Sequence, residues 1–402
     1  MGKYTNIDAH NCSIEELERE IEKMKDTVNY FNNNQLATKI WLNSVYGGLA
    51  NQYSEVYNVA LAEAITLQGQ HIIHFSSKVF DNYFKNVFHT QTELHKKLGI
   101  DLELASKPLN FNTLQVYGDT DSCYFSLDLL IKRFNIPDDK AAKFIVDIQK
   151  YGLESYLEKC YDEYAKRFQC HENLQVFEME KIARTCIMQK KKKYIMDIAW
   201  KEPNIFLEPL HDVLYKGIEV IQGSTPKFIR ESIKDFIELI LKSYSSTNSD
   251  KITYEDLINR VKEYKGKYLM QDPNDICLTR KLNEYEKHIL KDKPELSVNK
   301  GCPLHTRGAG IYNNLLYTKQ KKYKSKYQIA KSGDKVKYYY TKLPEPLDVF
   351  AYLPGSYPIE FAPPMDYDME FAKNVIAPIN RIVEILGYSP IPDSLIFSKA
   401  LW

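Results

Sequence analysis

The sequence has 402 residues, 44% of them hydrophobic and 13% aromatic, which is enough apolar surface for two or three packed units and argues against disorder. Lysine and arginine number 54 and aspartate and glutamate 53, so the net charge of +1 shows no global basicity, and any nucleic-acid site must be local. Seven scattered cysteines without a C-x-x-C pair argue against a disulfide framework and a zinc module. The first 13 residues hold no apolar h-region and the sequence has no apolar run of membrane length, so we expect neither export nor membrane spanning.

The first predicted element is a helix that begins near Ser13. Ser13 and Glu16, three residues later, form a capping box at its start. The polar run 32–34, three asparagines, predicts a break before a second helix near Gln35, and we expect the two helices to form an antiparallel hairpin. Apolar residues of the first helix recur at steps of three and four: Ile14, Leu17, Ile21, Met24, Val28 and Phe31.

A second long helix and a β-hairpin follow along the chain. Apolar residues at helical spacing, among them Ile65, Ile72 and Val79, predict a helix over residues 58–84. Residues 114–117 and 123–127 then read as two short strands, because their composition and alternation suit a half-buried strand. We expect a β-hairpin with acidic residues at its tip.

The rest of the sequence gives weaker signals. Residues 172–200 look extended and enclose the lysine run 190–193. Beyond Gly217 the pattern is helical and rich in loops, with lysine and tyrosine interleaved over 319–342. We place domain boundaries near residues 50 and 215.

The hairpin tip Gly118-Asp-Thr-Asp-Ser122 is the most informative stretch. Asp119 and Asp121 lie two residues apart, so their carboxylates point in similar directions and repel each other unless a divalent cation lies between them. Magnesium prefers a few carboxylates together with substrate phosphates. The alternative is a polar turn in which aspartate and glycine serve only as turn formers.

A second group of polar residues lies on the predicted helix near Gln35. Lys39, Asn43 and Tyr46 are spaced i, i+4 and i+7, and therefore share one helix face. A cation, an amide and a flat ring suit the phosphates, sugar and base of a nucleotide. The alternative is a surface lysine on an amphipathic helix that ends at Gly47-Gly48.

Together, these two stretches resemble the K-x-x-x-N-S-x-Y-G and Y-G-D-T-D-S motifs of family B DNA polymerases. The matching segments are residues 39–47 and 117–122. A third segment follows in the family's order, because Lys192-Lys193-Tyr194 resembles the K-x-Y motif that contacts the primer-template duplex. The resemblance implies an α+β fold with a palm of antiparallel sheet and helices, a pair of fingers helices and a mostly helical thumb.

Within the family, the sequence is most similar to the T-even phage polymerases, from about Ser13 to its end. The segments 217–219, 222–227 and 303–308 resemble thumb segments of those enzymes. The resemblance implies distal fingers over residues 1–50, a palm over 51–215 and a thumb over 216–402. It further implies that Lys192, Tyr194, Lys227 and Arg307 contact DNA and that Glu180 is an accessory palm carboxylate.

The family mechanism assigns a role to each motif residue. Family B enzymes add a deoxynucleotide to a primer 3′-hydroxyl by phosphoryl transfer with two magnesium ions. By resemblance, Asp121 is a direct metal ligand and Asp119 lies beside it. Asn43 and Tyr46 line the dNTP pocket, and Lys39 binds the nucleotide phosphates.

Parts of the family pattern are missing from the sequence. The first catalytic motif, D-x-x-S-L-Y-P, is not found, and neither are the 3′-5′ exonuclease and the first fingers helix. We therefore expect a split enzyme whose N-terminal half supplies these parts and packs against the apolar stripe of the first helix. A phage source, and hence the host cytoplasm, fits the resemblance.

Two other readings of the sequence stay open. One is a noncatalytic DNA-binding or processivity subunit that retained polymerase motifs, although a scaffold would not need all of Lys39, Asn43, Asp119 and Asp121. Another is an RNA polymerase or reverse transcriptase, which lacks the 39–47 motif. The tail 394–402 resembles a peptide that binds a sliding clamp, and packing of this tail on the thumb is the alternative.

Overall fold

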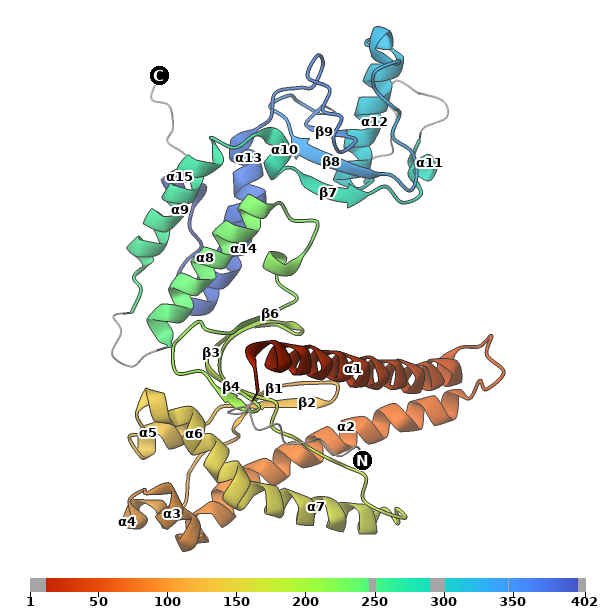
Figure 1. Ribbon diagram of the computed structural model, residues 1–402. Helices are drawn as coiled ribbons and strands as arrows, with labels where there is room; N and C mark the ends of the chain where they lie inside the picture. Colours follow the sequence, from red (N-terminus) through yellow and green to blue (C-terminus); the bar gives the residue numbers. More distant parts are fainter. Residues whose placement is uncertain (1–11, 246–250, 290–300, 346, 397–402) are drawn as a thin grey trace. The chain divides into compact units, whose positions relative to one another are not determined.

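The computed structural model of the protein describes residues 12–245, 251–289, 301–345 and 347–396. In these ranges helices are combined with small antiparallel sheets, which confirms the predicted α+β class (Figure 1). No helix among these residues is both long enough and apolar enough to cross a membrane.

The chain folds into two compact units that are not continuous in sequence. The first unit holds Met1–Thr90 and Pro108–Leu127, and the second holds Gln91–Lys107 and Asp128–Trp402. The described residues of the first unit form two long helices, two short helical turns and one hairpin. These elements are α1 (Ile14–Ala50), α2 (Val59–Asn82), η1 (Tyr83–Val87), η2 (Phe88–Thr90), β1 (Gln115–Asp119) and β2 (Ser122–Phe125).

Both long helices of the first unit begin at side-chain caps. The Glu16 backbone N–H donates to Ser13 Oγ at 3.3 Å, and the Ser13 backbone N–H donates to Glu16 Oε2 at 2.9 Å. This reciprocal pair is the predicted capping box. Asn58 caps α2, because its Oδ1 accepts from the Leu61 backbone N–H at 3.0 Å. The start of α1 and most of α2 therefore follow the sequence prediction.

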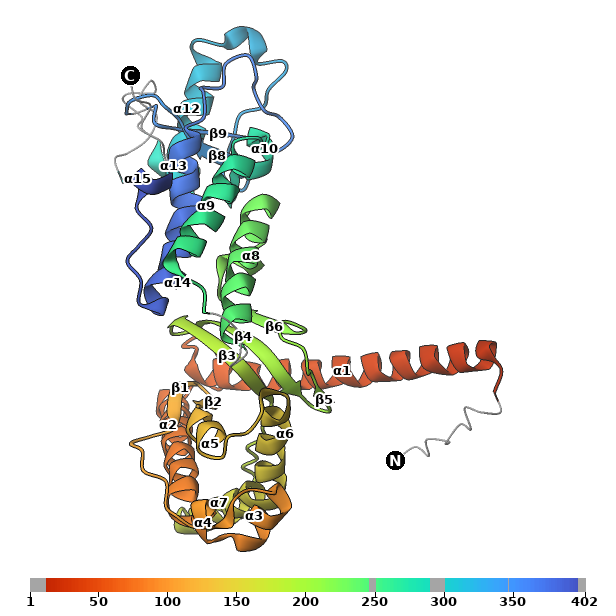
Figure 2. The same ribbon diagram turned by 90° about the vertical axis from the view of Figure 1, so that its left-hand side faces the viewer.

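The predicted break within α1 is wrong. α1 runs through the asparagines 32–34 and through Gly47-Gly48 to Ala50, 37 residues or about 55 Å at 1.5 Å per residue. An asparagine in a helix costs less than about 1 kcal/mol, and no proline interrupts the segment. The turn at residues 51–58 instead joins α1 to α2, and the two helices diverge from this turn (Figures 1 and 2).

The second unit contains a sheet of four antiparallel strands flanked by helices. Strand β4 (Lys193–Lys201) is central: it pairs with β3 (Lys181–Lys190) on one side and with β5 (Asn204–Ile205) and β6 (Val213–Lys216) on the other. The predicted extended segment therefore forms strands over only part of its length. The helices that precede the sheet are α3 (Thr92–Leu98), α4 (Leu102–Ala105), α5 (Asp128–Arg133), α6 (Asp138–Ile148), η3 (Gln149–Leu153) and α7 (Glu154–Arg167).

A buried polar network ties this sheet to the helix that follows it. Asp197 on β4 is fully buried and forms an ion pair with Arg184 at 3.6 Å. The Ser245 hydroxyl, at the end of α8 (Lys227–Tyr244), donates to Asp197 Oδ2 at 2.7 Å. A buried carboxylate needs such partners, because an unpaired charge in the interior is costly.

The later part of the second unit has a helical group built on one large apolar core. Ile229, Ile233, Phe236, Ile237 and Ile240 lie on one face of α8, and all are buried. α8 packs against α9 and α14, and the three helices run alongside one another (Figure 2). The further elements of this group are η4 (Glu219–Ile221), α9 (Tyr254–Tyr268), α13 (Tyr367–Phe371), η6 (Ala372–Ile376), α14 (Ala377–Val383), η7 (Glu384–Leu386) and α15 (Asp393–Ile396).

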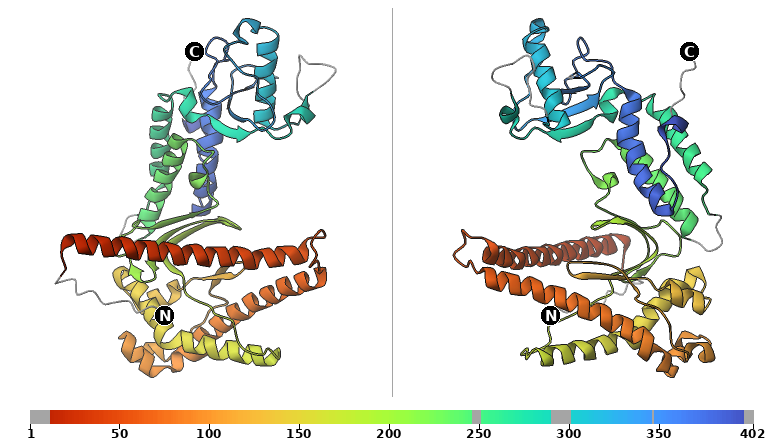
Figure 3. Two further views of the ribbon diagram at one scale, coloured as in Figure 1. Left: turned by 45° about the vertical axis from the view of Figure 1, so that its right-hand side comes forward. Right: turned by 180° about the vertical axis from the view of Figure 1, so that it is seen from behind.

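A three-stranded antiparallel sheet, which the sequence did not predict, completes the second unit. Helix α12 packs on strand β9 of this sheet (Figure 3). A side chain at Gly308 of α12 would meet the backbone of Phe350 and Ala351 at 2.9 Å, so glycine permits this close approach. The elements here are α10 (Pro273–Ile276), β7 (Leu278–Lys281), α11 (Tyr285–His288), α12 (Leu304–Tyr317), η5 (Lys321–Tyr323), β8 (Lys335–Tyr340) and β9 (Val349–Tyr352).

Candidate functional site

The two predicted metal-binding aspartates lie at the tip of the β1–β2 hairpin. Asp119 is the last residue of β1 and pairs with Ser122, so the loop has two residues, Thr120 and Asp121. The Asp121 backbone N–H donates to the Asp119 carbonyl oxygen at 2.6 Å, and Ser122 Oγ donates to the same oxygen at 3.1 Å. The predicted hairpin with an acidic tip is confirmed.

Thr120 adopts a backbone conformation that the sequence did not indicate. Its φ is +55°, in the left-handed region that a β-branched residue rarely enters. This conformation costs roughly 1–2 kcal/mol and persists only where the surroundings hold it. Here Thr120 Oγ1 donates to Asp119 Oδ1 at 3.2 Å, which links the strained residue to one of the two carboxylates.

The two carboxylates differ in their surroundings. Asp119 is half-buried, whereas Asp121 is exposed. No group of three or more histidine, cysteine, aspartate or glutamate side chains suited to a metal ion occurs among the described residues. Two carboxylates fit magnesium, which completes its coordination with water and substrate phosphates, better than they fit a structural metal held by protein ligands alone.

Contacts with α2 hold the hairpin in place. The Leu114 backbone N–H donates to Asp81 Oδ1 at 2.9 Å, and Ser77 Oγ donates to Gln115 Oε1 at 2.7 Å. Gly118 lies opposite Cys123, and a side chain at this glycine would come within 2.9 Å of the Gln115 amide nitrogen. The acidic tip therefore projects from a fixed base on α2.

The predicted nucleotide-binding residues share one face of α1. Lys39, Asn43 and Tyr46 lie in one unbroken helix, so the spacing i, i+4 and i+7 places them along a single stripe. All three side chains are exposed. The helix ends at Ala50, two residues beyond Gly47-Gly48. The polar stripe is thus free to contact a ligand.

The predicted DNA contact Lys192 lies in the tight turn between β3 and β4. Lys192 is exposed and has a φ of +64°. Tyr194, two residues later, is only 8% exposed, so only a small part of its side chain could reach a ligand. Gly217 packs directly against this turn: its φ is +64°, and a Cβ there would overlap the carbonyl oxygen of Lys192.

The remaining predicted residues have varied surroundings. Lys227 begins α8, is exposed and lies 3.7 Å from the Glu231 carboxylate. Arg307, on α12, is half-buried and donates to Asp348 at 2.7 Å, with Glu345 at 3.8 Å. Glu180 is exposed, immediately before β3, and forms an ion pair with Lys181 at 3.2 Å.

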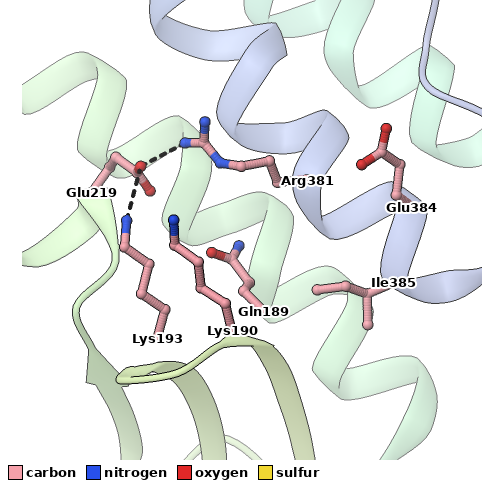
Figure 4. Close-up of a pocket in the computed structure, with 7 residues that line it drawn as sticks. All are labelled: Gln189, Lys190, Lys193, Glu219, Arg381, Glu384 and Ile385. Atoms are coloured by element: carbon pink, nitrogen blue, oxygen red, sulfur yellow. Dashed lines mark hydrogen bonds and ion pairs between the residues drawn. The ribbon is translucent and has the colours of Figure 1, made fainter.

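A hollow that the sequence did not predict lies beside the β3–β4 turn. Its volume is about 370 Å³. Glu219 Oε1 lies 3.8 Å from Lys193 Nζ and 2.5 Å from Arg381 Nη2 (Figure 4). The lysine run 190–193 is visible in the sequence, but nothing there linked it to Arg381. The hollow is lined by Gln189, Lys190, Lys193, Glu219, Arg381, Glu384 and Ile385.

One unit thus holds both an antiparallel hairpin with paired aspartates at its tip and a helix with a lysine, asparagine and tyrosine stripe. The sequence matches DNA polymerase family B over residues 15–385. The chain therefore belongs to the family B DNA polymerases, as its motifs predicted.

Several viral polymerases are similar to the chain. The DNA-directed DNA polymerase of Enterobacteria phage T4 is 26% identical over 304 residues, which are 73% of this chain and 30% of that protein. The corresponding enzyme of Escherichia phage RB69 is 24% identical, over 52% of this chain and 22% of its own length. The DNA polymerase of Choristoneura biennis entomopoxvirus is 24% identical, over 59% and 23%. The chain thus spans less than a third of these relatives.

Proposed function

We propose that the chain forms the distal fingers, palm and thumb of a DNA-directed DNA polymerase that adds deoxynucleotides to a primer 3′-hydroxyl. The observation that carries this proposal is the hairpin tip, where Asp119 and Asp121 project from a base fixed on α2. In this proposal residues 1–50 are the fingers part, 51–215 the palm and 216–402 the thumb.

The exposure of each side chain supports a separate role in the proposed active site. Asp121 is exposed and would bind magnesium directly, while half-buried Asp119 would lie beside it. Two magnesium ions, when bound, supply activation of the primer hydroxyl and positive charge for the departing pyrophosphate. Lys39 would bind the nucleotide phosphates, and Asn43 and Tyr46 would contact the sugar and base.

The second unit would hold the primer-template duplex. Lys192 and Lys227 are exposed and suited to phosphate contacts, which give affinity without sequence preference. Tyr194 is mostly buried and would act largely by supporting the turn. Arg307 would have to leave its ion pair with Asp348 in order to bind a phosphate. Glu180 would serve as an accessory carboxylate.

The proposed partner is an N-terminal polymerase half that carries the exonuclease and the first catalytic motif. This half would be either a separate polypeptide or a preceding segment. The sequence holds no D-x-x-S-L-Y-P motif. In addition, α1 has no buried residue, and the side chains of Ile14, Ile21, Met24 and Val28 are 76%, 50%, 52% and 56% exposed. An exposed apolar stripe of this kind marks an interface with further polypeptide.

Primer extension tests the proposed function directly. The chain is incubated with primer-template, magnesium and dNTPs, alone and together with the N-terminal half, and NTPs replace dNTPs in a parallel series. We expect template-directed extension only in the mixture. Robust extension by the chain alone would contradict the need for a partner, and stable DNA binding by an inactive mixture would favour the noncatalytic DNA-binding subunit.

Clamp binding by the C-terminal tail is a separate proposal. Of the predicted segment 394–402, residues 397–402 lie outside the described residues. Deletion of the last nine residues should abolish clamp-stimulated synthesis and leave basal synthesis unchanged. Unchanged clamp stimulation would argue against this role.

A further inference from the structure

We propose that the hollow beside the β3–β4 turn binds a phosphate group of the nucleic-acid backbone and that Glu219 is an internal anion that competes for this site. The inference rests on the proposed polymerase function, because it adds a contact to primer-template DNA. Lys190, Lys193 and Arg381 would bind the phosphate. The family resemblance gives Lys190 and Arg381 no role, and it places Glu219 in the thumb-like segment 217–219 without a role of its own.

The first argument is the placement of like charges. Lys190 and Lys193 are direct partners across the β3–β4 ladder, and both ammonium groups point into the hollow (Figure 4). Like charges directly opposite each other destabilise a strand pair. Arg381 brings a third cation from α14, a helix that contacts β3. Without a neighbouring anion, the mutual repulsion of these three cations costs free energy. An anion in the hollow lowers this repulsion.

The second argument is the position of the Glu219 carboxylate. A single oxygen, Oε1, lies within ion-pair distance of both Lys193 and Arg381. That is the position a phosphate oxygen would take between two cations. Glu219, the first residue of η4, lies two residues after Gly217, and Gly217 packs against the hairpin turn.

The third argument is that Glu219 does not form an ion pair with every cation of the hollow. Lys190 is exposed and makes no ion pair with any described residue. Glu384 also lines the hollow, without an ion pair among the described residues, so three cations face two carboxylates. The hollow of about 370 Å³ is many times the roughly 30 Å³ that one water occupies in the liquid. It therefore has room for a phosphate group with some of its hydration.

The location favours a backbone phosphate over a free one. The hollow adjoins the turn that presents Lys192, so a duplex held by Lys192 would place a neighbouring phosphate close to Lys190 and Lys193. A free ligand such as pyrophosphate would present the same kind of phosphate group to the hollow. The experiment therefore includes both ligands.

The test measures binding of a fluorescent primer-template duplex to the full chain by anisotropy across a salt series. Lys190→Gln should lower the affinity roughly two- to fivefold and make the slope of log K against log salt less steep by about 0.9, the value for one lost phosphate contact. Lys262→Gln, at an exposed lysine on α9 outside the hollow, is the matched control and should change neither quantity.

The Glu219→Gln variant distinguishes a carboxylate that competes with a phosphate from one that only positions the cations. If Glu219 competes with a phosphate, its neutralisation should raise duplex affinity about threefold, the size of one exposed ion-pair effect. A lower affinity would show that the carboxylate positions the cations, and would overturn its role as a competitor. Thermal unfolding of each variant shows whether the fold is intact, and Lys190→Gln removes no ion pair between described residues.

The remaining outcomes also decide between the proposals. If the unmodified chain binds no duplex, the proposed DNA-binding function fails together with the hollow. If it binds and Lys190→Gln behaves like Lys262→Gln, only the phosphate site is refuted. Pyrophosphate binding that depends on Lys190, with unchanged duplex affinity, would overturn the assignment to the nucleic-acid backbone.

Discussion

The ring of Phe125, at the end of β2, stacks on the ring of Phe80 in α2, with centroids 3.6 Å apart and planes 13° from parallel. This contact joins the acidic hairpin to α2. The position of Asp119 and Asp121 therefore depends on an aromatic pair that binds no substrate itself.

Phe125→Leu should loosen the hairpin without unfolding the chain. An aromatic pair contributes about 0.5–1.5 kcal/mol beyond the area that it buries, so the amides of residues 119–122 should exchange hydrogen roughly three- to tenfold faster. Hydrogen exchange with mass-spectrometric detection measures this. Phe168→Leu, which removes a ring contact with Tyr164 in the other unit, should leave these amides unchanged. Equal exchange in both variants would contradict the anchoring role.

Asp121→Asn tests the proposed metal ligand, because it keeps the size of the side chain and removes its charge. In the mixture with the N-terminal half, we expect extension to fall at least about 1000-fold, which is about 4 kcal/mol at 1.36 kcal/mol per decade. Duplex binding should persist. Asp139→Asn, at an exposed aspartate on α6, is the control. Extension by Asp121→Asn at a near-normal rate would refute the assignment.

Lys39→Ala tests the proposed phosphate contact on α1. A charge-assisted hydrogen bond is worth on the order of 1.5–3 kcal/mol, so KM for dNTPs should rise about tenfold or more while duplex affinity stays constant. Lys25→Ala changes another exposed lysine of the same helix and should leave KM unchanged. A loss of duplex affinity at constant KM would instead place Lys39 on a DNA-contacting surface.

Gly217→Ala should destabilise the second unit. The left-handed φ of +64° disfavours any residue with a Cβ by roughly 1–2 kcal/mol, and this Cβ would also overlap the Lys192 carbonyl oxygen. We expect the free energy of unfolding in urea to fall by about 2 kcal/mol or more. Gly223→Ala is the matched control, because a Cβ there meets nothing within 4 Å. Equal stability of the two variants would show that the turn rearranges easily.

Glu370→Gln should change the pH dependence of stability. Burial raises the pKa of Glu370 to about 8 from 4.5, although its carboxylate accepts from the Tyr340 backbone N–H and the Asn374 amide. The unfolded chain therefore loses this proton above about pH 4.5 while the folded chain keeps it until about pH 8, so the native protein loses stability across this window.

Glutamine does not titrate, so the advantage of Glu370→Gln should grow as pH rises through that window and level off above it. The full difference is of the order of a few kcal/mol, at about 1.4 kcal/mol per pKa unit. Thermal unfolding at several pH values measures it, with Glu158→Gln on α7, an exposed site, as the control. A difference that is constant with pH would mean that Glu370 does not titrate in this range.

The sequence by itself determined the features whose causes are local. Ser13 and Glu16 are three residues apart, so their capping box was readable from the spacing. The β1–β2 hairpin was readable because short strand-forming runs flank a turn-forming segment. The family was readable as well, because its motifs are continuous stretches of sequence that the match over residues 15–385 confirms.

Tertiary structure decided the features that join distant residues or compete with local preference. The asparagines 32–34 suggested a break, yet a weak local preference did not interrupt a continuous helix. The strands β7, β8 and β9 are short, and β7 lies more than 50 residues before its partner β8, so no single window of sequence showed the whole sheet. Arg381 meets Glu219 only because α14 packs beside β3, and a contact across 162 residues leaves no local pattern from which it could be predicted.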